Sequence, residues 1–228
     1  MIKTNINQHL QNNTFSTLFI GQNLIKLSAV DSTNNFLKIL MSNSEPLPEG
    51  TVIMADNQFA GRGQQQNVWQ SAPGKNLTFS IYLNPGFLEA HAQFKLNMAV
   101  SVALNQALRV YLGNEVRIKW PNDIYYKGKK LGGLLIENVL QGQYLKSSII
   151  GIGLNVNQQH FPIDLQTQAC SINQILQKDV ILIELLAVIC SHIEKQYLKL
   201  KADQTASLKS DYLERLYRYG ETTSFRHN

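Results

Sequence analysis

Hydrophobic residues occur along the chain with two different spacings, and the change from one spacing to the other predicts the order of the secondary-structure elements. Short runs of β-branched and other apolar residues, bounded by turn-forming residues, predict strands. Longer segments with apolar residues every three to four positions predict helices. The predicted strands are residues 51–55, 77–83, 116–120, 131–137 and 148–156, and the predicted helices are 32–41, 91–112, 180–200 and 208–219.

The order of these elements predicts the fold class. Strand-like and helix-like segments alternate without repeats or low-complexity linkers, which is typical of a mixed α/β domain. The first helix is entered through Asp31, Ser32 and Thr33, all suitable capping residues, and the second stops at Gly113. We expect helices to cover the sheet largely on one face.

Size and charge narrow the class of protein. With 228 residues, 44% of them hydrophobic, the chain can form one sizeable domain plus a small appendage. The 21 basic residues exceed the 16 acidic ones without forming runs of like charge. This excess favours an anionic partner such as ATP or an acidic protein over nucleic acid, although solvated surface lysines explain it equally well.

Cysteine spacing and hydropathy indicate the compartment. Cys170 and Cys190 show no CxxC or Cys/His ligand spacing, so we expect reduced, structural thiols. The first residues contain no apolar segment of signal-peptide length, and the most hydrophobic stretch, residues 180–190, contains Glu184 and is too short to span a bilayer. These features predict a cytoplasmic protein.

Candidate chemistry begins at the sequence AGRG, residues 60–63. Gly61 and Gly63 flank Arg62 and permit a positive φ, so amide groups can converge on an anion while the guanidinium binds a carboxylate or phosphate. The polar continuation GQQQN suggests a flexible lid. An ordinary tight turn with a surface arginine is the alternative.

The sequence KWPND, residues 119–123, is more specific. Pro121 favours an extended Trp120 at a strand end, so that Asn122 and Asp123 emerge together from a turn beside Lys119. Lysine suits charge that develops on phosphate oxygens, and Asn or Asp oxygens suit Mg²⁺ or a ribose. The alternative is a proline-aspartate turn with a solvated lysine.

The two motifs occur within a longer ordered pattern. DSTN at 31–34, Gln58, Trp69, PGKN at 73–76, KKLGGLLIE at 129–137 and GIGLNVN at 151–157 accompany them. In this order and spacing they resemble the biotin-protein ligase family, from about residue 27 to residue 219. The resemblance implies an α+β fold, with a central mixed sheet covered by helices, like the catalytic domains of class II aminoacyl-tRNA synthetases and biotin ligases.

The resemblance also implies a two-step reaction. Biotin and ATP, with Mg²⁺, would give biotinyl-5′-AMP, and a lysine of a biotin carboxyl carrier protein or domain would then take the biotin. Lys119 and Arg62 would be the catalytic residues. The residues implied for biotin are Ser32, Thr33, Asn34, Gln58, Gly61, Arg62, Gly63, Gln64, Lys119, Gly132 and Gly133, and those implied for ATP are Trp69, Asn122, Asp123 and Asn155, with Asp123 also a Mg²⁺ ligand.

The chain departs from the family pattern in two places. Gln64, Gln65 and Gln66 stand where many members carry basic residues, which predicts weaker retention of the adenylate. Residues 220–228 supply at most the first strand of the small C-terminal β-barrel that usually follows, so the expected domains are 1–219 (catalytic) and 220–228 (barrel remnant).

Several alternatives stay open. A lipoate or octanoyl transferase of the same fold and a non-catalytic biotin- or adenylate-binding module compete with the ligase. Gly132 and Gly133 either let the strand approach biotin closely or only belong to a twisted strand. The roughly thirty residues before DSTN are too few for a helix-turn-helix domain, so DNA binding is not expected. Family members often dimerise through the central sheet, and a homodimer is therefore an expectation.

Overall fold

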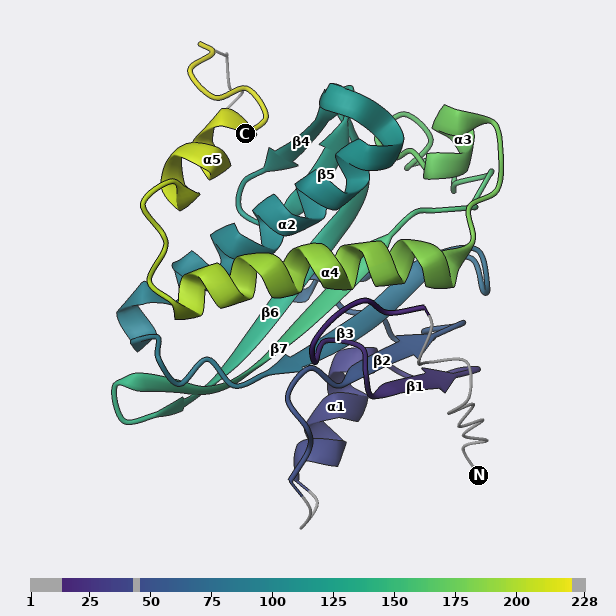
Figure 1. The fold of residues 1–228 in the computed structure, drawn as a ribbon. Helices are drawn as coiled ribbons and strands as arrows, with labels where there is room; N and C mark the ends of the chain where they lie inside the picture. The colour runs from purple at the N-terminus through teal and green to yellow at the C-terminus, as the bar shows by residue number, and fades with distance from the viewer. Residues whose placement is uncertain (1–13, 43–45, 223–228) are drawn as a thin grey trace.

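A seven-stranded mixed sheet forms the centre of the molecule (Figure 1). The computed structural model of the chain describes residues 14–42 and 46–222. The strand order is β1-β2-β3-β7-β6-β5-β4, and of these pairs only β1 and β2 run parallel. The strands are β1 Leu24–Leu27, β2 Val52–Ala55, β3 Leu77–Leu83, β4 Val116–Lys119, β5 Asp123–Tyr126, β6 Lys129–Gln141 and β7 Tyr144–Leu154.

Helices occur on both sides of this sheet. The α-helices are α1 Thr33–Met41, α2 Phe94–Leu112, α3 Ile172–Leu176, α4 Leu182–Lys201 and α5 Leu208–Glu214, and the short 3₁₀ turns are η2 Gln64–Gln66, η3 Ala90–Ala92 and η4 Gly113–Glu115. All five predicted strands and all four predicted helices are present. The predicted helix at 208–219 is too long, because it ends at Glu214. Strands β1 and β5 and helix α3, each four or five residues long, were not predicted.

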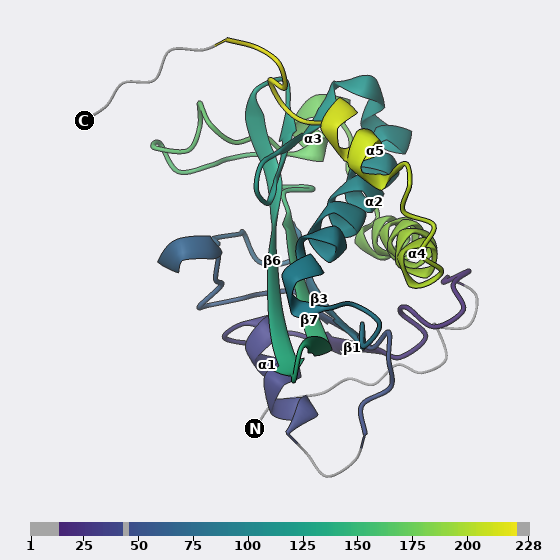
Figure 2. The same cartoon turned by 90° about the vertical axis from the view of Figure 1, so that its left-hand side faces the viewer.

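The helices form unequal layers. Helices α2, α4 and α5 lie together on one side of the sheet, whereas α1 and the short helix η2 lie on the other (Figure 2). The larger hydrophobic core lies under α2 and α4, and a smaller cluster around Leu27, Leu37 and Ile53 packs beneath α1. The prediction of a sheet covered largely on one face is confirmed.

Strand β7 shows how the sequence divides its side chains between the two faces. Ile150, Ile152 and Leu154 belong to the core under the helical layer. Because side chains alternate along a strand, Gly151 and Gly153 point to the opposite face. Two positions without side chains therefore lie side by side on the face that carries α1 and η2.

Two of the predictions concern residues at the ends of the chain that the structure does not describe. Residues 1–13, which lack a signal-peptide pattern, and residues 223–228, most of the predicted barrel remnant, lie outside the described residues. In the described part of the chain, no helix is both long and apolar enough to cross a membrane.

Candidate active site

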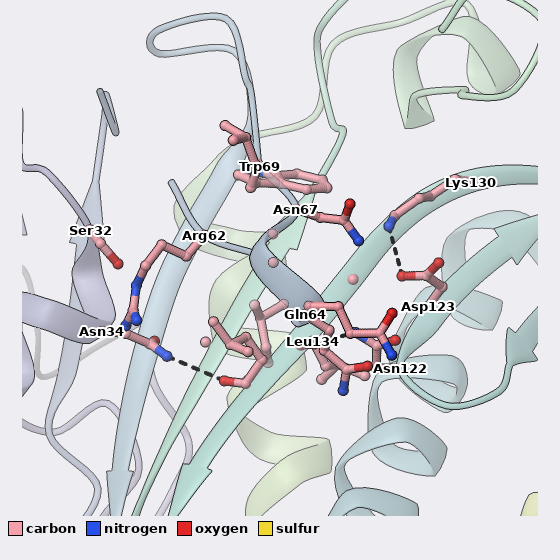
Figure 3. Close-up of a pocket in the computed structure, with 18 of the residues that line it drawn as sticks. Ser32, Asn34, Arg62, Gln64, Asn67, Trp69, Asn122, Asp123, Lys130 and Leu134 are labelled. Atoms are coloured by element: carbon pink, nitrogen blue, oxygen red, sulfur yellow. Dashed lines mark hydrogen bonds and ion pairs between the residues drawn. The ribbon is translucent and has the colours of Figure 1, made fainter. Parts of the chain in front are cut away.

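A cavity of about 290 Å³ opens on the sheet face that carries α1 and η2. Its walls are the first turn of α1, the turn between β4 and β5, and residues 61–69, which we call the lid; β6 and β7 form its floor (Figure 3). The described residues that line it are Ser32, Thr33, Asn34, Gln58, Arg62, Gly63, Gln64, Gln65, Asn67, Val68, Trp69, Trp120, Pro121, Asn122, Asp123, Lys130, Gly133, Leu134, Leu135, Gly151, Ile152 and Gly153.

The floor depends on the two glycines of β7. A Cβ atom on Gly151 would collide with the Asn34 side chain, and a Cβ atom on Gly153 would lie 2.5 Å from Trp69 Cε2. Both distances are far below ordinary contact between heavy atoms. The GIG sequence thus allows Asn34 and Trp69 to rest directly on the sheet.

Polar side chains gather at the start of α1. Ser32, Thr33 and Asn34 are each only 3% exposed. Gln58 Oε1 accepts hydrogen bonds from the Thr33 backbone amide (2.8 Å) and hydroxyl (3.0 Å), so it serves as the cap of the helix. Ser32 is the N-cap residue, but its side chain makes no capping hydrogen bond to any described residue, which leaves the hydroxyl available to a ligand. Ser80 Oγ, from β3, donates to Asn34 Oδ1 at 2.6 Å.

Backbone hydrogen bonds close the lid on itself. The Gly63 amide donates to Asn67 O (2.7 Å), and the Trp69 amide donates to Gly61 O (2.9 Å). Gly61 is needed because a Cβ atom there would collide with the Trp69 carbonyl oxygen. Neither Gly61 nor Gly63 is among the described glycines with positive φ. The predicted reason for these glycines was therefore wrong: they permit close packing within the lid, and the Gly63 amide is already bonded there.

Trp69 ends the lid and enters the pocket (Figure 3). Its indole ring rests on the backbone of Gly153. Its Nε1 atom is buried and has no hydrogen-bond partner among the described residues. Since a buried indole N–H usually finds an acceptor, this atom is a ready donor to a bound ligand.

An ion pair marks the opposite end of the pocket. Lys130 Nζ lies 2.7 Å from Asp123 Oδ1. Asn122 precedes Asp123, and its side-chain amide donates to Leu134 O (2.7 Å) while Leu134 N donates to Asn122 O (2.8 Å). This pairing fixes the β4–β5 turn on β6, so Asn122 and Asp123 emerge together, as the WPND sequence predicts.

Lys130 was not predicted as a site residue, although it belongs to the KKLGGLLIE motif. In the pairing of β5 with β6, Ile124 lies opposite Gly132 and Tyr125 lies opposite Lys130, so Leu131 is an extra, bulged residue. A bulge reverses the alternation of side chains. Lys130 therefore points to the same face as Gly133, whereas simple alternation along the strand would direct it to the helical layer.

Lys119, the predicted catalytic lysine, is placed differently. It lies opposite Asp123 on the edge strand β4. Its Nζ atom donates to the Tyr125 hydroxyl (2.8 Å) and lies 4.7 Å from the centroid of that ring. The pocket lining formed by the described residues includes Lys130 and does not include Lys119.

Arg62 shares a carboxylate with two other side chains. Glu137 Oε2 accepts hydrogen bonds from Arg62 Nη2 and from Asn34 Nδ2, both at 2.8 Å, and Glu137 Oε1 accepts one from Lys38 Nζ at 2.7 Å. Burial alone would raise the pKa of Glu137. The hydrogen bonds from Lys38 and Asn34 and the charges of Arg62 and Lys38 outweigh burial, so the pKa lies below its ordinary value.

The remaining predicted residues lie outside the pocket lining. Asn155 is 4% exposed, and its side chain donates to Cys170 O (3.1 Å), so it joins the end of β7 to a neighbouring loop. Gly61 belongs to the lid but is not among the described residues that line the pocket. A Cβ atom on Gly132 would collide with the Leu154 side chain, so this glycine serves close packing of β6 against β7.

The pocket offers limited means of holding a metal. No group of three or more His, Cys, Asp or Glu side chains that could bind a metal ion occurs among the described residues. Asp123 is the one carboxylate in the described pocket lining. A single carboxylate fits a Mg²⁺ ion that takes its other ligands from phosphate oxygens and water.

Comparison with known proteins identifies the family. Residues 27–155, more than half of the chain, match the biotin/lipoate A/B protein ligase family. The chain belongs to this family. The matched segment contains every residue that lines the pocket.

Individual relatives agree with this assignment. A biotin protein ligase from Aquifex aeolicus, solved in complex with biotin and ATP, is 31% identical with a TM-score of 0.74, over 86% of this chain and 78% of that chain. The bifunctional ligase/repressor BirA of Bacillus spizizenii is 39% identical over 160 residues, which cover 69% of this chain and 48% of that protein. The biotin--[acetyl-CoA-carboxylase] ligase of Paracoccus denitrificans is 35% identical over 134 residues, which cover 57% and 53%. The chain thus spans about half the length of these two curated relatives.

Proposed function

We propose that this protein is a biotin-protein ligase. One observation carries the proposal: a single lid covers both a buried polar group of side chains at α1 and a charged end at Lys130 and Asp123. Such a pocket suits a ligand with a compact polar head and a reacting anionic tail. The biotin and ATP bound to the Aquifex aeolicus ligase, which is similar in sequence and fold, support this interpretation.

The polar end would recognise the cyclic urea of biotin. A urea carries one carbonyl acceptor and two N–H donors, and it needs both kinds of partner in a dry site. The Ser32 hydroxyl can donate, and the Thr33 hydroxyl oxygen can accept, while Gln58 holds Thr33 in place. The fused rings would lie in the cavity beside Asn34.

The charged end would carry the first chemical step. A carboxylate oxygen of biotin attacks the α-phosphorus of ATP, the bond from that phosphorus to the bridging oxygen breaks, and pyrophosphate leaves. Negative charge accumulates on the phosphate oxygens during this transfer. We assign its neutralisation to Lys130, which lines the pocket, in place of Lys119, and we keep Arg62 as the second cation.

The lid would cover the adenylate. Trp69 would stack on adenine, and Asn122 and Asp123 would face the nucleotide, with Asp123 a ligand of Mg²⁺ once its pair with Lys130 opens. Exclusion of water protects a mixed anhydride from hydrolysis. The amine of a lysine on a biotin carboxyl carrier protein or domain then attacks the biotinyl carbonyl, and AMP leaves.

Three wider expectations belong to this proposal. Residues 1–219 would form the catalytic domain, and Gln64, Gln65 and Gln66 would loosen the hold on the adenylate. The protein acts in the cytoplasm without binding DNA. It pairs with a second copy through the central sheet.

Biotin-dependent exchange of labelled pyrophosphate into ATP tests the first step without the acceptor protein. We expect exchange with biotin and Mg²⁺, and none with lipoate. Exchange that occurs with lipoate but not with biotin would show that the protein transfers lipoate instead. Biotin binding without exchange would replace it with a non-catalytic binding module.

A further inference from the structure

Glu137 lies just outside the pocket and connects two residues that line it. Asn34 belongs to the polar end of the pocket and Arg62 to the lid, and both donate to the same oxygen, Glu137 Oε2, at 2.8 Å. In Figure 3, Arg62 lies next to Asn34, on the side of the pocket opposite Lys130 and Asp123. The guanidinium is therefore held at the polar end before any ligand is present.

Asn34 has little freedom to turn away from this arrangement. Ser80 donates to its amide oxygen at 2.6 Å, and the side chain occupies the space that a Cβ atom on Gly151 would fill. Its amide nitrogen consequently faces Glu137. Arg62 differs, because its side chain is 38% exposed and belongs to the lid, which is closed by its own backbone hydrogen bonds.

Lys38 provides Glu137 with a second cation. Its Nζ atom lies 2.7 Å from Glu137 Oε1, the oxygen that Arg62 does not use. If Arg62 leaves, Glu137 still keeps the Lys38 ion pair and the Asn34 hydrogen bond. A half-buried carboxylate would lose much more by the departure of its sole cation.

We propose that Glu137 is a positioning residue that holds Arg62 in the unliganded protein and gives it up to the anionic group of the ligand. Lys38 lowers the free energy needed to release Arg62, because Lys38 stays paired with Glu137. The inference rests on the proposed function, since it takes the carboxylate of biotin as the competing anion. It adds that carboxylate recognition is set by competition between Glu137 and the ligand for one guanidinium.

The competition predicts opposite effects for two neighbouring substitutions. Glu137→Gln keeps an oxygen for Asn34 but removes the charge that holds Arg62, so binding of a carboxylate ligand should strengthen. Lys38→Met leaves Glu137 more dependent on Arg62, so binding of the same ligand should weaken. Damage to the fold would weaken binding in both variants.

The measurement compares biotin with biotin methyl ester by isothermal titration calorimetry. The ester lacks the charge, so the ratio of its dissociation constant to that of biotin isolates carboxylate recognition. Glu137→Gln should raise this ratio about two- to fivefold, the range expected for an ion pair near the surface, and Lys38→Met should lower it about twofold. In an Arg62→Ala background, Glu137→Gln should leave the ratio unchanged. Glu214→Gln, at an exposed position on α5, is the matched control.

The outcomes separate this inference from the proposed function. A wild-type protein that binds neither ligand refutes the function, and the inference falls with it. Wild-type binding of both ligands, with the same ratio in Glu137→Gln, refutes the inference and leaves the function standing. Equal weakening of both ligands by Glu137→Gln also refutes it, because Glu137 would then act only through Asn34.

Discussion

Replacing Gly153 with alanine should weaken nucleotide binding strongly while lowering the stability of the fold only slightly. The added Cβ atom would lie 2.5 Å from Trp69 Cε2, 2.7 Å from Cζ2 and 2.9 Å from Cδ2. Carbon atoms in good contact are about 3.5–4.0 Å apart, so the indole ring must move by roughly 1 Å or more. Gly153 is not among the described glycines with positive φ, so the backbone itself accepts alanine.

The cost in stability should be small because the part that yields is the lid. Overpacking costs about 1–3 kcal/mol in a rigid core, and we expect the lower end here since Trp69 is only half-buried. For a chain of this size, about 1 kcal/mol lowers the melting temperature by roughly 2–4 °C. Stacking of a base on an aromatic ring contributes about 1–3 kcal/mol, so ATP binding should weaken roughly 5- to 150-fold.

Pyrophosphate exchange at varied ATP concentration measures this effect, with thermal unfolding measured on the same protein. Gly86→Ala is the matched control, because its added Cβ atom would lie no closer than 3.9 Å to its nearest neighbour. In a Trp120→Phe background Trp69 is the one remaining tryptophan, and its emission should shift to the red in the Gly153 variant. Unchanged ATP dependence together with unchanged emission would refute the idea that Gly153 seats the Trp69 ring.

Three further predictions concern Lys130, Glu194 and Glu137. Lys130→Ala should lower the exchange rate about 10²- to 10³-fold, whereas Lys119→Ala should lower it less than about tenfold; equal losses in exchange assays would contradict the assignment. Glu194 is 6% exposed and accepts three backbone N–H groups, those of residues 18–20, at 2.7–3.0 Å. Glu194→Gln should therefore reduce the free energy of unfolding by about 2 kcal/mol in urea titrations, and no change would show that this buried contact is dispensable. Since the pKa of Glu137 is lowered in the fold, its contribution to stability is present above its ordinary value of 4.5 and is lost as the pH falls through the folded-state pKa. The difference in melting temperature between wild type and Glu137→Gln should shrink at acid pH, and a constant difference would argue against an ionic contribution.

Local patterns in the sequence determined most of the fold. Strand and helix periods gave five of the seven strands and the four longer helices of the described chain, because burying one face imposes a regular spacing of apolar residues. Strands β1 and β5 were missed because most of their residues are only half-buried, so they lack the clear apolar pattern of the equally short β2 and β4. The GIG sequence of β7 likewise predicts which face each residue takes, since alternation along a strand directs Ile152 to the core and the two glycines to the pocket.

The residues that make the site were only partly visible in the sequence. Ser32, Thr33, Asn34, Gln58 and the lid could be recognised because they occur in short motifs, and the fold brings them around one cavity. Which of Lys119 and Lys130 lines the pocket depended on the tertiary structure, since both lie in recognisable motifs and both carry the same charge.

Two features were decided by the tertiary structure alone. The bulge at Leu131 reverses the alternation of β6 and turns Lys130 into the pocket, and the glycines that follow it do not by themselves determine where such a bulge lies. The Arg62–Glu137 pair joins residues 75 positions apart. Such a pair forms because the sheet brings β6 under the lid, and pairing across that distance follows from strand order and register, which local sequence patterns do not contain.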